Sequence, residues 1–172
     1  MEKTFDWGRI GDIAVGRENM GADMPVAVYR LLMYSMMDEL SERYGKEPAN
    51  DIVRGIGYRA GMAIAENLLV DSGGDFNVFV ADLQQKLKDL KVGILRIESV
   101  DLDKQHIILT VSEDLDCSGL PVTGESVCIY DEGLLTGLLF AVTGKKFSVI
   151  EVDCWATGDR TCRFEASACS GN

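Results

Sequence analysis

Hydrophobic residues recur at helical spacing in the segment that follows Pro25 and ends at Gly45. Proline is tolerated in the first turn of a helix and glycine commonly follows the last turn, so these residues mark the expected ends. Leu31 and Met37 lie off the main apolar stripe, which makes this helix hydrophobic on more than one face. Such a helix is usually packed on two sides, either within the domain or between two subunits.

Two further helices are expected in the first half of the chain. The second begins near Asn50 and Asp51, which are good capping residues, and carries an apolar stripe as far as the turn at residues 71–74. The third begins after Asp75, another capping residue, and ends at Gly93. The first half of the chain is therefore predicted to be helical.

The second half of the chain changes to short segments rich in β-branched residues, which predict two hairpins separated by a fourth helix. In that helix Gly133 and Gly137 form a small-residue face suited to close packing. The expected strands are residues 94–100, 106–112, 147–155 and 160–166, and the expected helix is residues 126–142. This element order predicts an α+β fold with helices packed on an antiparallel sheet.

The chain has the length and composition of one globular domain. It has 172 residues, of which 47% are hydrophobic and 26% are charged. We expect residues 1–24 to form an irregular lead-in, residues 25–166 to form the domain, and residues 167–172 to form a C-terminal tail.

Charge and hydropathy exclude several classes of partner. The formal net charge of −11 repels phosphate backbones and anionic lipid surfaces, so neither nucleic acid nor membrane is expected as a partner. The first residues do not have the pattern of a signal peptide, and no apolar run reaches the roughly 20 residues of a membrane span. The expected location is cytoplasmic, where the five cysteines would be reduced thiols or metal ligands.

Four residues near the C-terminus form a candidate metal site. If residues 157–159 are a three-residue hairpin loop, Cys154 lies opposite Cys162 with Cβ atoms about 4.5–5.5 Å apart, and the two thiolates can share one Zn²⁺. Glu151 lies on the opposite face of a regular strand from Cys154, so it joins them only if a β-bulge intervenes. Cys128, early in the fourth helix, would supply the fourth ligand.

Spacing alone leaves two other interpretations of these cysteines open. An opposed pair of cysteines can be a cross-strand disulfide, or it can be ordinary core, because a free cysteine behaves as a small buried hydrophobe. The separation of Cys154 from Cys162 is also a weaker zinc signature than paired C-x-x-C units.

The last third of the chain has a recognisable pattern, formed by Glu125-Ser126-Val127-Cys128, Gly133, Gly137, Glu151-Val152-Asp153-Cys154-Trp155, Gly158-Asp159 and Cys162-Arg163-Phe164. This pattern resembles the 4-vinyl reductase domain family, and the resemblance extends over roughly residues 25–166. The family also supplies the sensor part of bacterial activators that respond to phenols and other aromatics. Its name comes from a proposed role in reducing a vinyl group during bacteriochlorophyll synthesis.

The resemblance has implications for the metal and for the fold. In the aromatic-sensing members zinc is held by a cysteine, a glutamate and two further cysteines, which Cys128, Glu151, Cys154 and Cys162 match in order and separation. It also implies a fold related to the subunits of the TRAPP vesicle-tethering complex, with homodimers formed through helices. Four protein ligands would leave no position open for water, as in structural zinc sites.

Other candidate motifs are weaker. Gly55-Ile56-Gly57-Tyr58-Arg59-Ala60 fits G-x-G-x-x-A, but it lies inside a predicted helix and not after a strand, so it does not predict a dinucleotide site. Asp114 and Asp116 are expected to be solvated, and the nearby Cys117 matches none of the four proposed ligands. His106 is expected to be a packed or surface residue, and Cys169 a bystander in the polar tail.

The sequence favours a binding function over a catalytic one. We expect a sensor domain that encloses a hydrocarbon or aromatic small molecule, with a structural zinc ion and no chemistry performed on the ligand. One alternative is a reductase of a tetrapyrrole vinyl group, which would need an electron donor that the sequence does not indicate. Another alternative is a dimeric scaffold or adaptor like the vesicle-tethering subunits.

Overall fold

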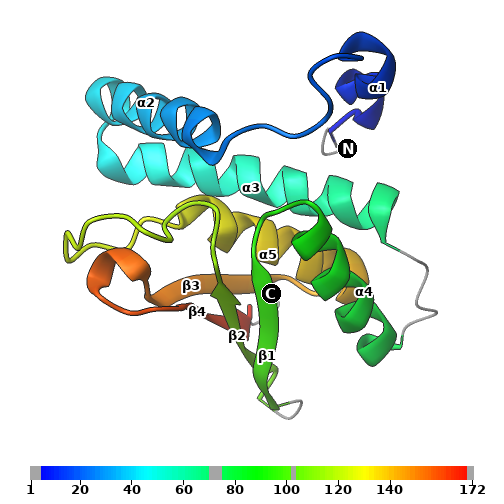
Figure 1. Ribbon diagram of the computed structural model, residues 1–172. Helices are drawn as coiled ribbons and strands as arrows, with labels where there is room; N and C mark the ends of the chain where they lie inside the picture. Colours follow the sequence, from blue (N-terminus) through cyan, green and yellow to red (C-terminus); the bar gives the residue numbers. More distant parts are fainter. Residues whose placement is uncertain (1–4, 70–74, 102–103, 170–172) are drawn as a thin grey trace.

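The computed structural model describes residues 5–69, 75–101 and 104–169, and Figure 1 shows how their helices and strands are layered. In chain order the elements are η1 (Trp7–Ile10), α1 (Ile13–Gly16), α2 (Val26–Tyr44), α3 (Lys46–Leu68), α4 (Phe76–Asp89), β1 (Ile94–Asp101), β2 (His106–Ser112), α5 (Ile129–Thr143), β3 (Phe147–Asp153), η2 (Trp155–Thr157) and β4 (Cys162–Ala168). Helix α2 lies against α3, α3 packs on α5, and α5 packs on the sheet (Figure 1). This architecture confirms the predicted α+β fold.

The strands form one antiparallel sheet in the order β1-β2-β4-β3 within the described residues. Strand β1 pairs with β2, with Ile94 opposite Ser112, which confirms the first predicted hairpin. Part of its expected turn, residues 102–103, lies outside the described residues. Strand β4 pairs with both β2 and β3, so Cys162 lies at the end of a central strand, opposite Val111 of β2.

The second predicted hairpin is wrong at its turn. Strand β3 ends at Asp153 and β4 begins at Cys162, so the connection is longer than three residues. The Thr157 hydroxyl explains the difference, because it accepts a hydrogen bond from the Cys154 N–H at 3.0 Å and donates one to the Cys154 carbonyl at 2.7 Å. These bonds wind the segment after Cys154 into η2, and the ladder ends with Asp153 opposite Arg163.

Strand β3 contains the bulge that the proposed site requires. The register of the β3–β4 ladder shifts between Glu151 and Asp153, where two steps along β3 correspond to one step along β4. In a regular strand Glu151 and Cys154 would point to opposite faces. Both are buried here, because the bulge brings them to the same side.

Helices α3 and α5 touch along two pairs of glycines, as their small-residue faces predicted. A Cβ atom on Gly57 would lie 2.1 Å from the Tyr130 carbonyl oxygen, and one on Gly133 would lie 2.0 Å from the Arg54 carbonyl oxygen. Gly61 and Gly137 make the same kind of approach one turn further along. Any side chain at these positions would force the helices apart, so the glycines set how closely α5 can approach α3.

The helix ends agree with the sequence in part. The Asp75 carboxylate accepts hydrogen bonds from the N–H groups of Asn77 and Val78, which confirms the predicted cap of α4. Helix α3 begins at Lys46 and not near Asn50, because the left-handed Gly45 (φ 89°) turns the chain directly from α2 into α3. The predicted stop of α3 at residues 71–74 lies outside the described residues.

The hydrophobic core lies between α5, α4 and the sheet, and α2 contributes no fully buried residue to it. The segment before α2 contains two short helical turns, η1 and α1, and is therefore less irregular than expected. None of the helices in the described ranges is long and apolar enough to cross a membrane.

Candidate metal centre

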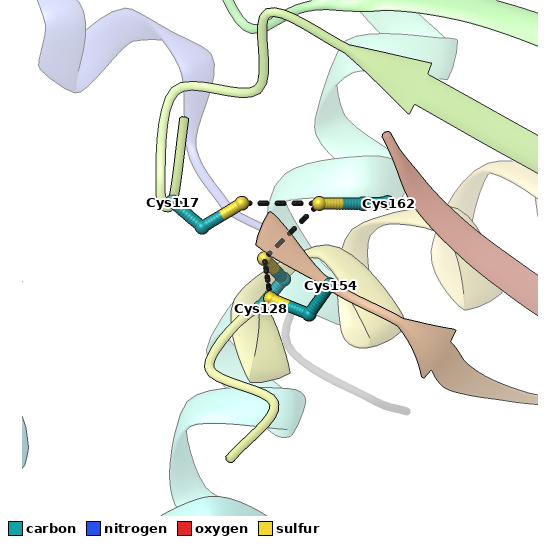
Figure 2. Close-up of side chains that lie close together, drawn as sticks. All are labelled: Cys117, Cys128, Cys154 and Cys162. Atoms are coloured by element: carbon teal, nitrogen blue, oxygen red, sulfur yellow. Dashed lines mark hydrogen bonds between the residues drawn. The ribbon is translucent and has the colours of Figure 1, made fainter. Parts of the chain in front are cut away.

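Four buried cysteines from four different segments meet at one end of the sheet (Figure 2). Cys128 is the residue immediately before α5, Cys154 follows β3, and Cys162 begins β4. Cys117 comes from the loop between β2 and α5. All four are free thiols, and their Sγ atoms lie within 4.8 Å of one another.

The sulfur separations fit a tetrahedral metal. With Zn–S bonds of about 2.3 Å, the sulfurs of a regular tetrahedron lie about 3.8 Å apart. The Cys128 Sγ atom lies 3.9 Å from that of Cys154 and 3.8 Å from that of Cys162. The Cys117 and Cys162 sulfurs are closer, at 3.0 Å. A buried cluster of this kind could hold a metal ion, because soft thiolate donors suit zinc and similar ions.

The thiols share their protons unequally. Hydrogen bonds from the thiols of Cys117, Cys128 and Cys162 lower the pKa of Cys154, so Cys154 is the thiol that ionises first. Hydrogen bonds with Cys117 and Cys154 are the leading causes that raise the pKa of Cys128. A bound cation would stabilise all the thiolates, and its binding would therefore release protons from the cluster.

Glu151 lies beside the cysteines but outside the group of mutually close ligand atoms. Its Oε2 atom accepts a hydrogen bond of 3.2 Å from the Cys128 N–H, while its buried Oε1 atom has no hydrogen-bond partner. Its own N–H donates to Glu132, which also accepts from Arg54 of α3. Burial raises the pKa of Glu151 to about 8. The carboxyl group is thus held close to Cys128 by the backbone at the start of α5.

The loop that carries Cys117 is buried and ordered by hydrogen bonds. Asp114 Oδ1 accepts from the N–H groups of Asp116 (2.8 Å) and Cys117 (3.1 Å), which folds the loop around its own carboxylate. The Asp116 carboxylate accepts a hydrogen bond of 2.6 Å from the Tyr29 hydroxyl of α2. The expectation that these two aspartates are solvated is therefore wrong, since their backbone and tyrosine partners replace water.

The surroundings of the cluster are rich in buried carboxyl groups. Burial, followed by the charge of Asp114, raises the pKa of Asp116 to about 7. Burial also raises the pKa of Asp131 in the first turn of α5, and the neighbouring charges of Asp114 and Asp116 raise it further. Such a concentration of acidic groups in a buried region favours a cation nearby.

The remaining candidates lie away from the cluster. His106 is 3.8 Å from Glu165 at the far end of the sheet, and Cys169 is exposed. Gly57 of the G-x-G-x-x-A segment contacts α5 inside α3, so this segment is a packing surface.

Of the four residues proposed from the sequence, the structure brings Cys128, Cys154 and Cys162 together and places Glu151 next to them. Sequence reasoning missed Cys117 as a member of the cluster. Its signal was only the adjacent Asp114, which can cap a tight turn.

A separate apolar cavity of about 510 Å³ lies against the outer face of α3. Most of its lining is apolar, and Arg59 and Tyr130 are the polar exceptions. The lining residues are Phe5, Trp7, Ile10, Ile56, Arg59, Ala60, Ala63, Ile64, Leu90 and Tyr130. The space under α2, near the Cys117 loop, is much smaller, at about 10 Å³.

Sequence comparison places the chain among known proteins. Residues 107–168 match the model of the vinyl-4-reductase domain family. The uncharacterized protein MJ1642 of Methanocaldococcus jannaschii is 30% identical over 148 residues, which are 86% of this chain and 80% of that protein.

Three solved structures share the fold. The phenol-responsive sensory domain of the transcription activator PoxR, solved with phenol, has a TM-score of 0.65 and 20% identity over 86% of this chain and 76% of that one. A vinyl-4-reductase family protein from Methanocaldococcus jannaschii has a TM-score of 0.63 and 17% identity over 99% of both chains. Trafficking protein particle complex subunit 3 from Naegleria fowleri, covalently bound to palmitic acid, has a TM-score of 0.67 and 12% identity over 84% of this chain and 95% of that one.

The last of these structures confirms the predicted relation to the vesicle-tethering subunits at the level of fold. The match of residues 107–168 and the identity to MJ1642 over most of both chains show that this protein belongs to the vinyl-4-reductase domain family.

Proposed function

We propose that this chain is a binding domain for an apolar small molecule and that a zinc ion stabilises the end of its sheet. The observation that carries the proposal is the cavity of about 510 Å³ with a largely apolar lining. Ligand pockets of proteins commonly measure about 300–1,000 Å³ and combine apolar walls with a few polar groups. In this cavity Arg59 and Tyr130 are the groups that could orient a polar end of the ligand.

Two neighbours with the same fold support an apolar ligand. The PoxR domain was solved with phenol, and the trafficking subunit is covalently bound to palmitic acid. Both molecules have a large apolar part and one oxygen-bearing end, which suits a cavity with apolar walls and Arg59 and Tyr130 among its lining residues.

The zinc ion is proposed to be structural. The ligand set inferred from the family resemblance is Cys128, Glu151, Cys154 and Cys162. An ion bound there would join the start of α5 to β3 and β4, and four protein ligands leave no position for water or substrate. This arrangement supports a binding function more than a metal-dependent reaction.

A homodimer is proposed because α2 exposes large hydrophobic residues. Leu31 and Leu32 are 73% and 69% exposed, and Val28 on the same helix is about half exposed. Burying them against a second copy would remove this apolar surface from water.

A thermal-shift experiment tests the ligand proposal. The zinc-bound protein is heated with phenols, hydrocarbons and fatty acids, and a ligand at a hundred times its Kd should stabilise the fold by about 2.7 kcal/mol. That corresponds to roughly 5–10 °C for a domain of this size. Tetrapyrrole turnover with a reduced cofactor would instead support the reductase alternative.

Ile56→Trp should abolish the shift, because Ile56 lines the cavity and a tryptophan would fill part of it. Ile52→Trp is the matched control, since Ile52 is one turn away on α3, equally exposed, and not among the lining residues. An equal ligand shift in both variants would show that the ligand binds elsewhere.

A further inference from the structure

The loop after β2 supplies a cysteine to the cluster that the family's ligand pattern does not include. Cys117 is fully buried, and its Sγ atom lies 3.0 Å from that of Cys162 (Figure 2). It belongs to the group of four sulfurs that lie within 4.8 Å of one another, whereas Glu151 does not.

We propose that Cys117 is the fourth ligand of the metal, giving a site of four thiolates, and that Glu151 lies outside the coordination shell. This inference rests on the metal proposed above and changes the identity of one ligand. The metal would then join the β2–α5 loop to α5, β3 and β4.

The loop conformation supports the assignment of Cys117. The Asp114 carboxylate accepts the N–H groups of Asp116 and Cys117, so the turn that presents the thiol is fixed by a side chain that is itself 2% exposed. Helix α2 fixes the same loop from outside. Arg30 donates to the carbonyls of Leu115 (2.8 Å) and Ser118 (2.9 Å). A thiol held this firmly loses little freedom on binding a metal, which favours ligation.

The position of Glu151 supports its exclusion from the shell. One carboxylate oxygen accepts the Cys128 N–H, and this bond orients the residue that carries the metal-binding sulfur. Outer hydrogen bonds of this kind commonly orient the ligands of a metal site. Glu151 is therefore a positioning residue that acts through Cys128.

Ligation by Cys117 requires a small movement. Its sulfur lies 3.0 Å from that of Cys162, whereas two thiolates on one zinc ion lie about 3.8 Å apart. The two sulfurs must separate by about 0.8 Å, which is within the range of a cysteine χ1 adjustment.

X-ray absorption at the zinc edge tests the proposal on the intact protein. The expected spectrum has four sulfur neighbours at about 2.3 Å and no nitrogen or oxygen neighbour at about 2.0–2.2 Å. Glu151→Gln should keep four sulfurs, and Cys117→Ser should replace one sulfur by a lighter atom. Three sulfurs and one oxygen in the unmodified protein, with Glu151→Gln altering the shell and Cys117→Ser leaving it unchanged, would overturn the assignment.

Two further measurements separate this proposal from the metal proposal itself. Elemental analysis of protein purified without added metal reports whether any ion is present, and its absence would overturn both. Alkylation of the denatured protein, with and without reductant, counts free thiols, and a Cys117–Cys162 disulfide would overturn the ligand role of Cys117 alone. If Cys117→Ser fails to fold, the spectra of the unmodified protein and of Glu151→Gln still decide between the two ligand sets.

Discussion

The Tyr29 hydroxyl of α2 donates a hydrogen bond of 2.6 Å to the buried carboxylate of Asp116, the residue immediately before Cys117. Removing the donor with Tyr29→Phe leaves that acceptor oxygen without this partner. Leaving a buried polar group unsatisfied costs about 1–3 kcal/mol, so the folded protein should lose that much free energy of unfolding. Denaturant titration of the zinc-bound protein measures the loss.

Tyr44→Phe is the control, because Tyr44 is an exposed tyrosine at the end of the same helix. It should change stability by less than about 0.5 kcal/mol. Equal effects of the two substitutions would mean that the Tyr29–Asp116 bond does not hold α2 to the loop.

The close approach of α3 and α5 predicts opposite effects for two Gly→Ala substitutions. Gly133→Ala places a Cβ atom 2.0 Å from the Arg54 carbonyl oxygen, so the helices must separate, at a cost of about 3 kcal/mol or more. Gly55→Ala lies on α3 with nothing within 4 Å of the added atom, and it should stabilise the helix by about 0.5–1 kcal/mol. Thermal unfolding measures both, and a tolerated Gly133→Ala would contradict the observed packing.

Arg54 contacts one buried and one exposed carboxylate, which predicts unequal effects. The side chain of Glu132 is 5% exposed, accepts from Arg54 and from the Glu151 N–H, and so ties α3 to α5 and β3. Glu132→Ala should cost about 2 kcal/mol or more, because the buried Glu151 N–H loses its acceptor as well. Asp51, which is 78% exposed, pairs with the same arginine, and Asp51→Ala should cost under about 0.5 kcal/mol. Similar losses in both variants would show that the buried pair has no special role.

The proposed homodimer predicts that a charge on α2 will separate the subunits. Leu31→Asp places a carboxylate in the exposed apolar stripe, and light scattering should then report a monomer at micromolar concentrations. Val122→Asp is the control, since Val122 is similarly exposed on the loop before α5. A monomer for the unmodified protein would remove the homodimer from the account.

Local signals predicted the elements of the fold well. Asp75 and Gly45 mark helix ends because the physics of a helix terminus is contained in a few neighbouring residues. The glycine pairs of α3 and α5 were also recognisable, since one missing side chain per turn leaves a visible pattern. The hairpin turn was mispredicted because Thr157 bonds to Cys154, a choice that turn statistics do not reveal.

The composition of the cysteine cluster could be predicted only in part. Cys154 and Cys162 belong to adjacent strands, so sequence spacing is informative for them. Cys117 reaches Cys162 across 45 residues of chain, through a loop whose path is set by its contacts with α2. The burial of Asp114 has the same origin, because its partners are the backbone groups of its own turn. Contacts of this length are set by tertiary packing and leave no periodic signal in the sequence.

The central claim is that the folded domain holds a zinc ion and an apolar small molecule together, and native mass spectrometry tests it most directly. Protein purified without added metal or ligand should carry one zinc ion per chain and an additional small mass that is released on denaturation. Ile56→Trp should keep the zinc ion and lose the small mass, because the substitution fills the cavity and lies away from the cysteines. A folded chain whose mass includes neither a metal ion nor a small molecule would contradict the account.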